Sequence, residues 1–428
     1  MKNLIYIAVL IAIYYAIRFL SPDFTIEEIS TLLVGVMLLS SYLFSNLIKK
    51  IKLPRLTGYM LMGAILGTSG IGILTQDVVD NLQFLENLAL SFIALTAGGE
   101  LRFDIIRKYR RSLGWILSGQ IIIIFTGMVG AFYLIAGQIK FFTELQPLVV
   151  LGFSVLFAGT ALSTSPATTI GIITELQSAG KITNFVLIIT VLKAIFLILV
   201  FPVIITMSRF LFVESGSFNL GVLKEIILQL LASFAIGIIM GGVIIWYLKK
   251  VKVEMSIFLL GAILAITEVS SLFGLEILLT SLVTGIVVQN FSKYGNRLIT
   301  NIEVFSLPVY VIFFCFAGAS LHLEILGQML FVTLFLVVAR LVLNYLGNLA
   351  GAVIAGESRL VRNISWMGYI GQAGIALGLG IIIEKNLPSD IGKYFFAILI
   401  STVVLNEMIG PVLLKYVFIK SGEAANTE

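Results

Sequence analysis

One lysine lies in the middle of a long apolar segment, where a helix would hold it away from water. The segment 183–202 is almost entirely apolar, yet Lys193 stands near its middle. An ionisable side chain inside a membrane is costly and usually marks a functional site. Arg340 occupies a similar place in the apolar segment 328–354. We therefore expect Lys193 to bind a ligand, and Arg340 either to join it or to clamp neighbouring helices together.

Two further apolar segments are interrupted by residues that disfavour a helix. In the segment 156–176 the interruption is Ser163-Thr164-Ser165-Pro166, and in 364–385 it is Gly371-Gln372-Ala373-Gly374. Proline lacks an N–H group and clashes with the carbonyl four residues earlier, so it stops the helical ladder. The polar groups available to a ligand near these breaks belong to Ser163, Thr164, Ser165, Thr168, Thr169 and Gln372. The alternatives are bonding of the hydroxyls to their own helix and close helix packing at the glycines.

The composition indicates a polytopic membrane protein. Of the 428 residues, 59% are hydrophobic and only 12% are charged, roughly half the charge of ordinary soluble domains. The net charge of +5 therefore concerns membrane topology and does not indicate binding of nucleic acid. Cys315 and His322 are the only residues of their types, so we expect no intrachain disulfide and no histidine-based metal site. We also expect no cofactor and no enzymatic activity.

Apolar runs long enough to cross a bilayer recur along the whole chain. We expect an all-α fold of about 14 transmembrane helices, the first retained rather than cleaved as a signal peptide. Basic residues gather in every second loop, and the positive-inside rule then places both termini in the cytoplasm of a cell-membrane protein. The expected spans are 4–20, 29–47, 56–74, 83–98, 112–136, 147–175, 184–208, 221–248, 255–271, 274–290, 302–320, 328–354, 363–384 and 391–417.

The two interrupted segments are the sixth and the thirteenth of these spans. They are seven spans apart, so equivalent helices cross the membrane in opposite directions. This spacing predicts an inverted repeat, with spans 2–7 mirrored by spans 9–14 and span 8 as a linker. Secondary transporters bind their substrate near the midplane between such broken helices, whose half-helix N-termini carry partial positive charge. The organisation therefore indicates a transporter with two crossed broken helices.

Four motifs then follow one another along the chain. They are LPRLTGYMLMGAILG (53–67), LENLALSFIALTAGGELRFD (85–104), PVYVIFFCFAGASLHL (308–323) and NEMIGPVLLK (406–415). In this order and spacing they resemble the cation/proton antiporter superfamily, in particular its monovalent cation/proton antiporter-2 branch. The resemblance covers nearly the whole chain beyond residue 30. It implies a homodimer in which a core domain moves like an elevator against a dimerising scaffold.

The resemblance also implies a division of the chain into domains. The scaffold is formed by two halves, the core by two further halves, and a linker helix and an additional N-terminal helix complete the chain. In chain order, the additional helix is 1–25, scaffold half one 26–110, core half one 111–210, the linker helix 211–252, scaffold half two 253–325, and core half two with a short tail 326–428.

One departure from the family pattern concerns charge. Where the family carries its ion-binding aspartates, this chain aligns Leu192-Lys193, and Arg340 stands where the family usually has lysine. Two buried cations without a carboxylate would repel a third cation by several kcal/mol. Together with the hydroxyls, Gln372 and the helix N-termini they favour an anion. The edges of the Phe313 and Phe316 rings are electropositive and could contact it, although packing against lipid or core is the alternative.

The leading hypothesis is therefore secondary active transport of a small inorganic anion. Because some members of the superfamily are associated with fluoride resistance, the resemblance points to fluoride export by fluoride/proton antiport, with Lys193 and Glu268 as candidate proton-coupling groups. Chloride or bicarbonate would fit the same residues, and the membrane potential alone could drive an anion outward.

Other hypotheses stay open. The chain could be a sodium or potassium/proton antiporter whose ligand is Glu268 or Glu276. It could also be a transport-dead structural or sensor homologue. Lys193 could instead be a purely structural residue, paired with a glutamate such as Glu86, Glu268 or Glu407.

Overall fold

The computed structural model describes most of the chain, and its described part is helical. It describes residues 2–20, 25–68, 70–212, 220–251, 254–319, 330–372, 375–376, 379–380, 383 and 389–425. In these ranges the sole β-type pairing is an isolated bridge between Gly67 and Leu74.

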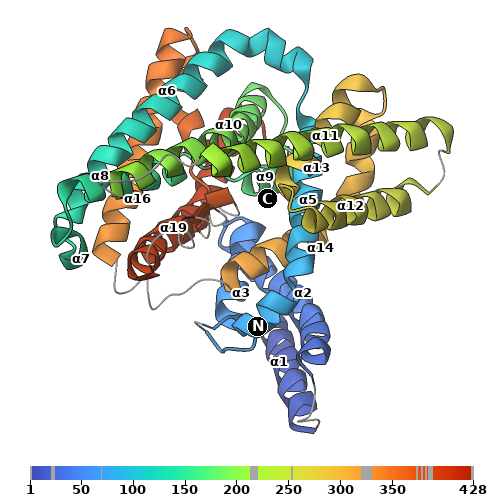
Figure 1. Cartoon of the computed structure of the whole chain (residues 1–428). Coiled ribbons are helices and arrows are strands. Elements are labelled where there is room, and N and C mark those ends of the chain that lie inside the picture. Colours follow the sequence, from blue (N-terminus) through green and yellow to red (C-terminus); the bar gives the residue numbers. More distant parts are fainter. Residues whose placement is uncertain are drawn as a thin grey trace.

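The helices follow one another closely along the chain (Figure 1). Their bounds are α1 (Lys2–Leu20), α2 (Ile26–Lys50), α3 (Arg55–Leu66), α4 (Gln76–Asn81), α5 (Gln83–Glu100), α6 (Phe103–Ala136), α7 (Lys140–Thr143), α8 (Pro147–Ala161), α9 (Pro166–Leu176), α10 (Lys181–Phe212), α11 (Leu220–Lys250), α12 (Met255–Leu272), α13 (Ile277–Phe291), α14 (Gly295–Ala319), α16 (Leu330–Ile354), α17 (Arg359–Ile364), the 3-10 helix η1 (Ser365–Tyr369) and α19 (Ser389–Ser421).

The structure has fewer helices that could span a membrane than the sequence predicts. Nine helices in the described residues are long and apolar enough to cross a membrane, or ten if α14, bent by 66°, counts as one span. Pro308 lies inside α14 and explains a break there. Two helices in predicted spans are short, with 12 residues in α3 and 15 in α13, whereas a full crossing takes about 20. The protein is thus an all-helical, multi-pass membrane protein, and the count of fourteen is not confirmed.

Two tightly packed helix pairs are compatible with the predicted inverted repeat. The helices α3 and α14 pack at Gly63 and Gly318, and α5 and α13 pack at Gly98 and Gly285. A methyl group at any of these glycines would lie 1.9–2.2 Å from a backbone carbonyl oxygen of the facing helix. If α3 mirrors α13 and α5 mirrors α14, each pair is the image of the other.

The long helices surround these pairs. The helix α6 packs along α16, its expected mirror partner, and α10 packs on α8. In Figure 1, α11 crosses the front of the molecule, and α1 and α2 extend away from the rest at the bottom. The helix α1 packs mainly on α2.

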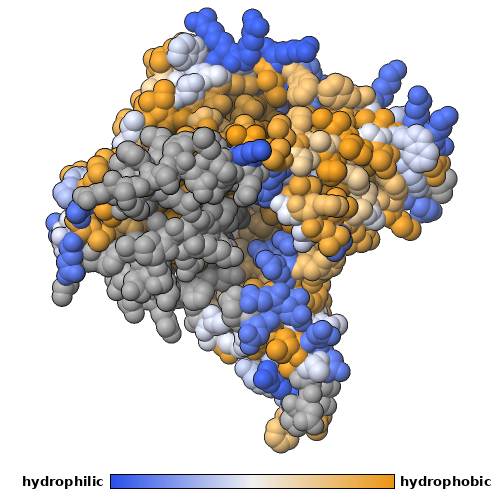
Figure 2. Space-filling model, viewed as in Figure 1, coloured by the Kyte–Doolittle hydropathy of each residue, from blue (hydrophilic) through white to orange (hydrophobic). Residues whose placement is uncertain are grey.

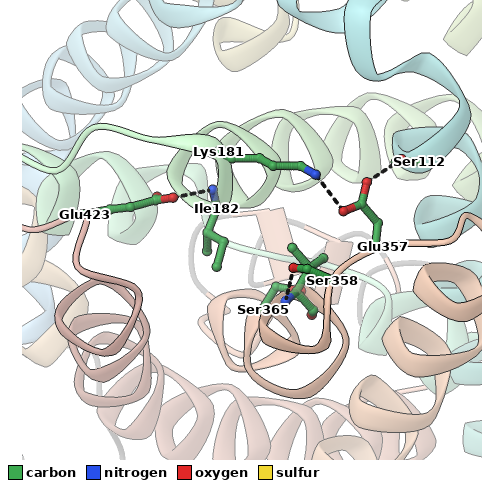
Figure 3. Close-up of polar contacts among 8 residues, drawn as sticks. Ser112, Lys181, Ile182, Glu357, Ser358, Ser365 and Glu423 are labelled. Carbon is green, nitrogen blue, oxygen red and sulfur yellow. Dashed lines mark hydrogen bonds and ion pairs between the residues drawn. The ribbon is translucent and has the colours of Figure 1, made fainter.

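One polar cluster ties the chain around α6 and α10 to its C-terminal part (Figure 3). The amine of Lys181 lies 2.7 Å from a carboxylate oxygen of Glu357, which precedes α17. The hydroxyl of Ser112 donates to the other oxygen of Glu357 at 2.6 Å. The tail carboxylate of Glu423 accepts the backbone N–H of Ile182 at 2.9 Å, in the first turn of α10. A negative charge is favourable at such a helix N-terminus.

We predict that Glu357→Gln lowers the thermal stability of the protein at neutral pH. Burial acts to raise the pKa of Glu357, but the hydrogen bonds from Lys181 and Ser112 outweigh it and hold the pKa below its usual value. A lowered carboxyl pKa stabilises the fold above the usual glutamate pKa, and this contribution disappears as the pH falls through the folded-state value. We expect a loss of about 1–2 kcal/mol near pH 7, which shrinks as the pH approaches about 4.

The measurement is the thermal unfolding of detergent-solubilised protein as a function of pH. Glu144→Gln is the matched control because Glu144 is exposed. An equal loss of stability at pH 7 and at pH 4 would contradict the assigned role of the Glu357 charge.

Candidate functional site

The two helix breaks lie where the sequence predicts them, and they touch. The first separates α8 from α9 at residues 162–165, and the second follows η1 at residues 370–372. The backbone N–H of Ser165 donates to the carbonyl of Gly371 at 2.9 Å. The hydroxyl of Ser165 caps α9 by accepting the N–H of Thr168 at 3.1 Å. Of the second predicted interruption, Ala373 and Gly374 lie outside the described residues.

Arg340 joins the two breaks from α16. Its guanidinium donates to the carbonyls of Ala161 at 2.9 Å and Ser163 at 2.7 Å on the first break. It also donates to the carbonyl of Ile370 at 2.6 Å on the second break, with a longer contact of 3.4 Å to Tyr369. These are carbonyls that an uninterrupted helix would satisfy. The contacts are those of a clamp, one of the two roles expected for this residue.

A chain of side-chain amides continues the site toward α19. The amide nitrogen of Gln372 donates to the hydroxyl of Ser163 at 2.8 Å and to the carbonyl of Thr160 at 3.1 Å. Its oxygen accepts a hydrogen bond of 2.8 Å from Asn406. Ser163 and Gln372, predicted as ligand-binding residues, are therefore brought together, and both are buried.

The same turn of α19 carries a carboxylate into the site. Glu407 is buried, and the hydroxyl of Thr168 donates to one of its carboxylate oxygens. The backbone amide of Gln372 and the positive charge of Arg340 also interact favourably with this carboxylate when it is ionised. Close packing of α19 is possible because Gly410 faces Gly371, where a methyl group would lie 2.6 Å from the Gly371 Cα.

Sequence reasoning considered Glu407 only as a structural partner for Lys193. The available signal was the pair Asn406-Glu407, two polar residues that follow the apolar run 395–405 and precede Pro411 in the same helix.

Lys193 lies beside this cluster, on the α6 side. Its amine donates to the side-chain oxygen of Gln120 on α6 at 3.1 Å and lies 6.0 Å from the centre of the Tyr369 ring. The side chain is only 1% exposed, and its charge interacts with that of Arg340. Described glutamates form no ion pair with Lys193, although a carboxylate partner was one of the expectations.

The remaining predicted residues divide into two groups. Thr164 and Phe313 line a small cavity with Ser165, between the start of α9 and the helices α5, α13 and α14. The hydroxyl of Thr164 also donates to the carbonyl of Thr190, one turn before Lys193. Thr169 is also buried, and its hydroxyl donates to its own helix at the carbonyl of Ser165.

The structure does not bring the second group to the breaks. Phe316 packs in a cluster with residues of α1, α2 and α3. Glu268 is exposed on α12. Glu276 lies at the start of α13, where its backbone N–H donates to Ser233. His322 lies outside the described residues.

The side-chain oxygens gathered at the breaks are suited to contact a small ion. Among the described residues there is no group of three or more histidine, cysteine, aspartate or glutamate side chains that could hold a metal ion. The oxygens of Glu407, Thr168 and Ser165 lie together between two broken helices, and broken helices of this kind hold the substrate site in secondary transporters. Fold and site together define a helical secondary transporter.

The comparison with protein families gives the family. The family model described as "Sodium/hydrogen exchanger, transmembrane" matches residues 34–420. The chain therefore belongs to the sodium/hydrogen exchanger family, within the cation/proton antiporter superfamily that the motifs indicated.

Characterised relatives and solved structures agree with this family. A Na⁺/H⁺ antiporter of Enterococcus hirae is 21% identical over 391 residues, 89% of this chain and 96% of the relative. The Na⁺/H⁺-K⁺ antiporter GerN of Bacillus cereus is 24% identical over 395 residues, 90% and 95% of the two chains. The sodium proton antiporter MjNhaP1 of Methanocaldococcus jannaschii has the same fold, with a TM-score of 0.69 at 17% identity over 92% of this chain and 98% of that one.

The expected export of fluoride, or of another small anion, is wrong. The relatives are named as Na⁺/H⁺ antiporters, one of them also for K⁺, and the structural neighbour is a sodium proton antiporter. The physical reason is that the expectation assumed a site without a carboxylate. Glu407 supplies one, and Arg340 directs its hydrogen bonds to backbone carbonyls.

We predict that Arg340→Lys strongly destabilises the protein although it keeps the charge. An ammonium ion cannot hold carbonyls of both breaks as the planar guanidinium does. At least two buried carbonyls then lose their donor, at about 1–3 kcal/mol each. The measurement is the melting temperature of the purified protein, with the exposed Arg102→Lys as control. A melting temperature equal to that of the wild type would show that the clamp does not hold the breaks.

Proposed function

We propose that this protein exchanges a monovalent cation, sodium or potassium, for protons across the cell membrane, and that Glu407 is the group that alternates between the two. The observation that carries the proposal is the buried carboxylate of Glu407 at the crossing of the broken helices, in contact with Thr168. The names of the relatives support the choice of substrates. On this reading the protein is a transporter without enzymatic activity.

Exchange follows from competition at one carboxyl group. An ionised Glu407 provides negative charge, and the hydroxyls of Thr168 and Ser165 provide further oxygen ligands for a cation. A proton on Glu407 removes that charge and with it most of the attraction for the cation. A site that holds either a proton or a cation, but not both, couples their movements in opposite directions.

Lys193 adds a second control over the cation. As an ammonium ion it repels a cation bound near the breaks, and this repulsion disappears when it loses its proton. Its amine is buried beside the breaks and donates a hydrogen bond to Gln120 on α6. Release of a proton from Lys193 would therefore favour binding of the cation at Glu407.

The larger movements are inferred from the family. We propose that the core, 111–210 and 326–428, moves against a scaffold, 26–110 and 253–325, and that the protein is a homodimer with both termini in the cytoplasm. The cavity at Thr164 and Phe313, between α9 and the helices α5, α13 and α14, lies along the boundary of these two parts. This position of the cavity supports the proposal that the core slides against the scaffold at this boundary.

We predict that Glu407→Gln abolishes cation-dependent proton movement. The protein is reconstituted in liposomes that contain a pH-sensitive dye, and sodium or potassium is added outside. The amide keeps the shape of the side chain and can neither ionise nor exchange a proton, so we expect a loss of at least about a hundredfold in rate, or about 2.7 kcal/mol.

Glu268→Gln is the matched control, because Glu268 is an exposed carboxylate on α12. It should exchange like the wild type. If Glu407→Gln remains active while Glu268→Gln is inactive, the site lies elsewhere and the proposal is wrong.

We also predict that Lys193→Gln lowers the cation concentration needed for half-maximal exchange at acidic pH. At an effective permittivity near 20, a like charge placed about 10 Å from a cation costs it about 1.7 kcal/mol, so the expected change is roughly ten- to twentyfold. The wild-type and variant values should converge at alkaline pH. An unchanged half-saturating concentration across the pH range would exclude this role of Lys193.

A further inference from the structure

Two basic helical segments, the start of α6 and α17, meet on one face of the molecule. The hydrogen bond between Ser112 and Glu357 holds the start of α6 against the turn between α16 and α17. Basic side chains flank both of its ends, and we call this set the basic platform. It consists of Arg107, Lys108, Arg110, Arg111, Arg359 and Arg362.

The platform is exposed and lacks acidic partners. Five of its members are exposed and Arg362 is partly buried. None of the six forms an ion pair with a described residue, since the two salt bridges found there are Arg102–Asp104 and Lys181–Glu357. The carboxylate that joins the two segments, Glu357, is already occupied by Lys181 and Ser112, and Asp104 pairs with Arg102. The like charges of the platform repel one another unless an anion lies among them.

The shape of α6 places this charge at a membrane surface. The backbone of Tyr109 is not helical (φ −109°, ψ 16°) and separates the first turns of α6 from its long apolar part. Beyond the kink, Trp115 is 46% and Ile122 61% exposed, seven residues apart and so on one side of the helix. Tryptophan prefers the boundary between headgroups and hydrocarbon. Figure 2 shows a row of hydrophilic residues at the upper edge, above a hydrophobic surface, where α6 begins in Figure 1.

We propose that the basic platform binds the phosphate headgroup of an anionic phospholipid, whose acyl chains lie along α6 at Trp115 and Ile122. Clusters of four to eight basic residues beside a membrane helix attract anionic headgroups. The exposed apolar side of α6 directly next to the charges favours a lipid over a free phosphate ion. Because the platform joins the start of α6 to α17, a bound headgroup neutralises both segments at once and stabilises their contact.

The test is thermal unfolding of the full-length protein in detergent with added phosphatidylglycerol, phosphatidylcholine or inorganic phosphate. We expect phosphatidylglycerol alone to raise the melting temperature of the wild type, by about 2 °C or more. The double variant Arg110→Ala/Arg111→Ala should lose at least half of this shift. The control Lys249→Ala/Lys250→Ala removes the same charge from the exposed end of α11 and should keep it.

A second variant and a direct measurement of bound lipid distinguish a loss of lipid binding from misfolding of the double variant. Arg359→Ala, in α17, should reduce the shift in the same way. Native mass spectrometry should find fewer retained phosphatidylglycerol molecules on both platform variants. An equal loss in the α11 control, or a shift of the same size with phosphatidylcholine, would overturn the proposal. So would an equal shift with inorganic phosphate, which would identify a soluble anion as the ligand.

Discussion

The fold depends on how backbone groups are satisfied where two helices stop inside a membrane. In hydrocarbon, an unpaired carbonyl or N–H costs several kcal/mol, so irregular backbone persists only where protein groups bond to it. Arg340 meets this requirement for carbonyls of both breaks, and the bond from Ser165 to Gly371 joins the breaks directly. The arginine is therefore better understood as part of the backbone scaffold than as a charge offered to a substrate.

The sequence was sufficient for everything that depends on local chemistry. Hydropathy located the long helices, and Pro166 and Gly371 located the breaks, because each acts on its own backbone. The structure places the predicted ligand-binding residues around the breaks. These residues are Ser163, Thr164, Ser165, Thr168 and Gln372. The spacing of the broken spans predicts an inverted repeat, and the packing of α3 on α14 and of α5 on α13 is compatible with it.

What the sequence could not provide was the partner of each buried charge. Lys193 and Glu407 are 214 positions apart, and whether a glutamate in α19 reaches the start of α9 depends on the approach of Gly410 to Gly371. Because the sequence does not reveal that contact, Lys193 and Arg340 alone indicated an anion site. The structure leaves Glu268 exposed on α12, away from the breaks, and no local pattern in the sequence indicates which face of that helix is exposed. In a membrane protein both faces of a helix are apolar, so periodicity gives little information on orientation.

The reciprocal glycine contacts have a consequence for how the chain assembles. Each close pair takes one helix from each half, because Gly63 meets α14 and Gly98 meets α13. During synthesis, α3 and α5 enter the bilayer before α13 and α14 have been made. Until then, their glycine faces contact lipid or other helices instead of their final partners. We infer that the N-terminal half is not an independent folding unit. Separately expressed halves would have to insert helices between one another and could not associate through a single preformed surface. An ancestor made of two identical short chains would already have needed this interlocked, antiparallel assembly.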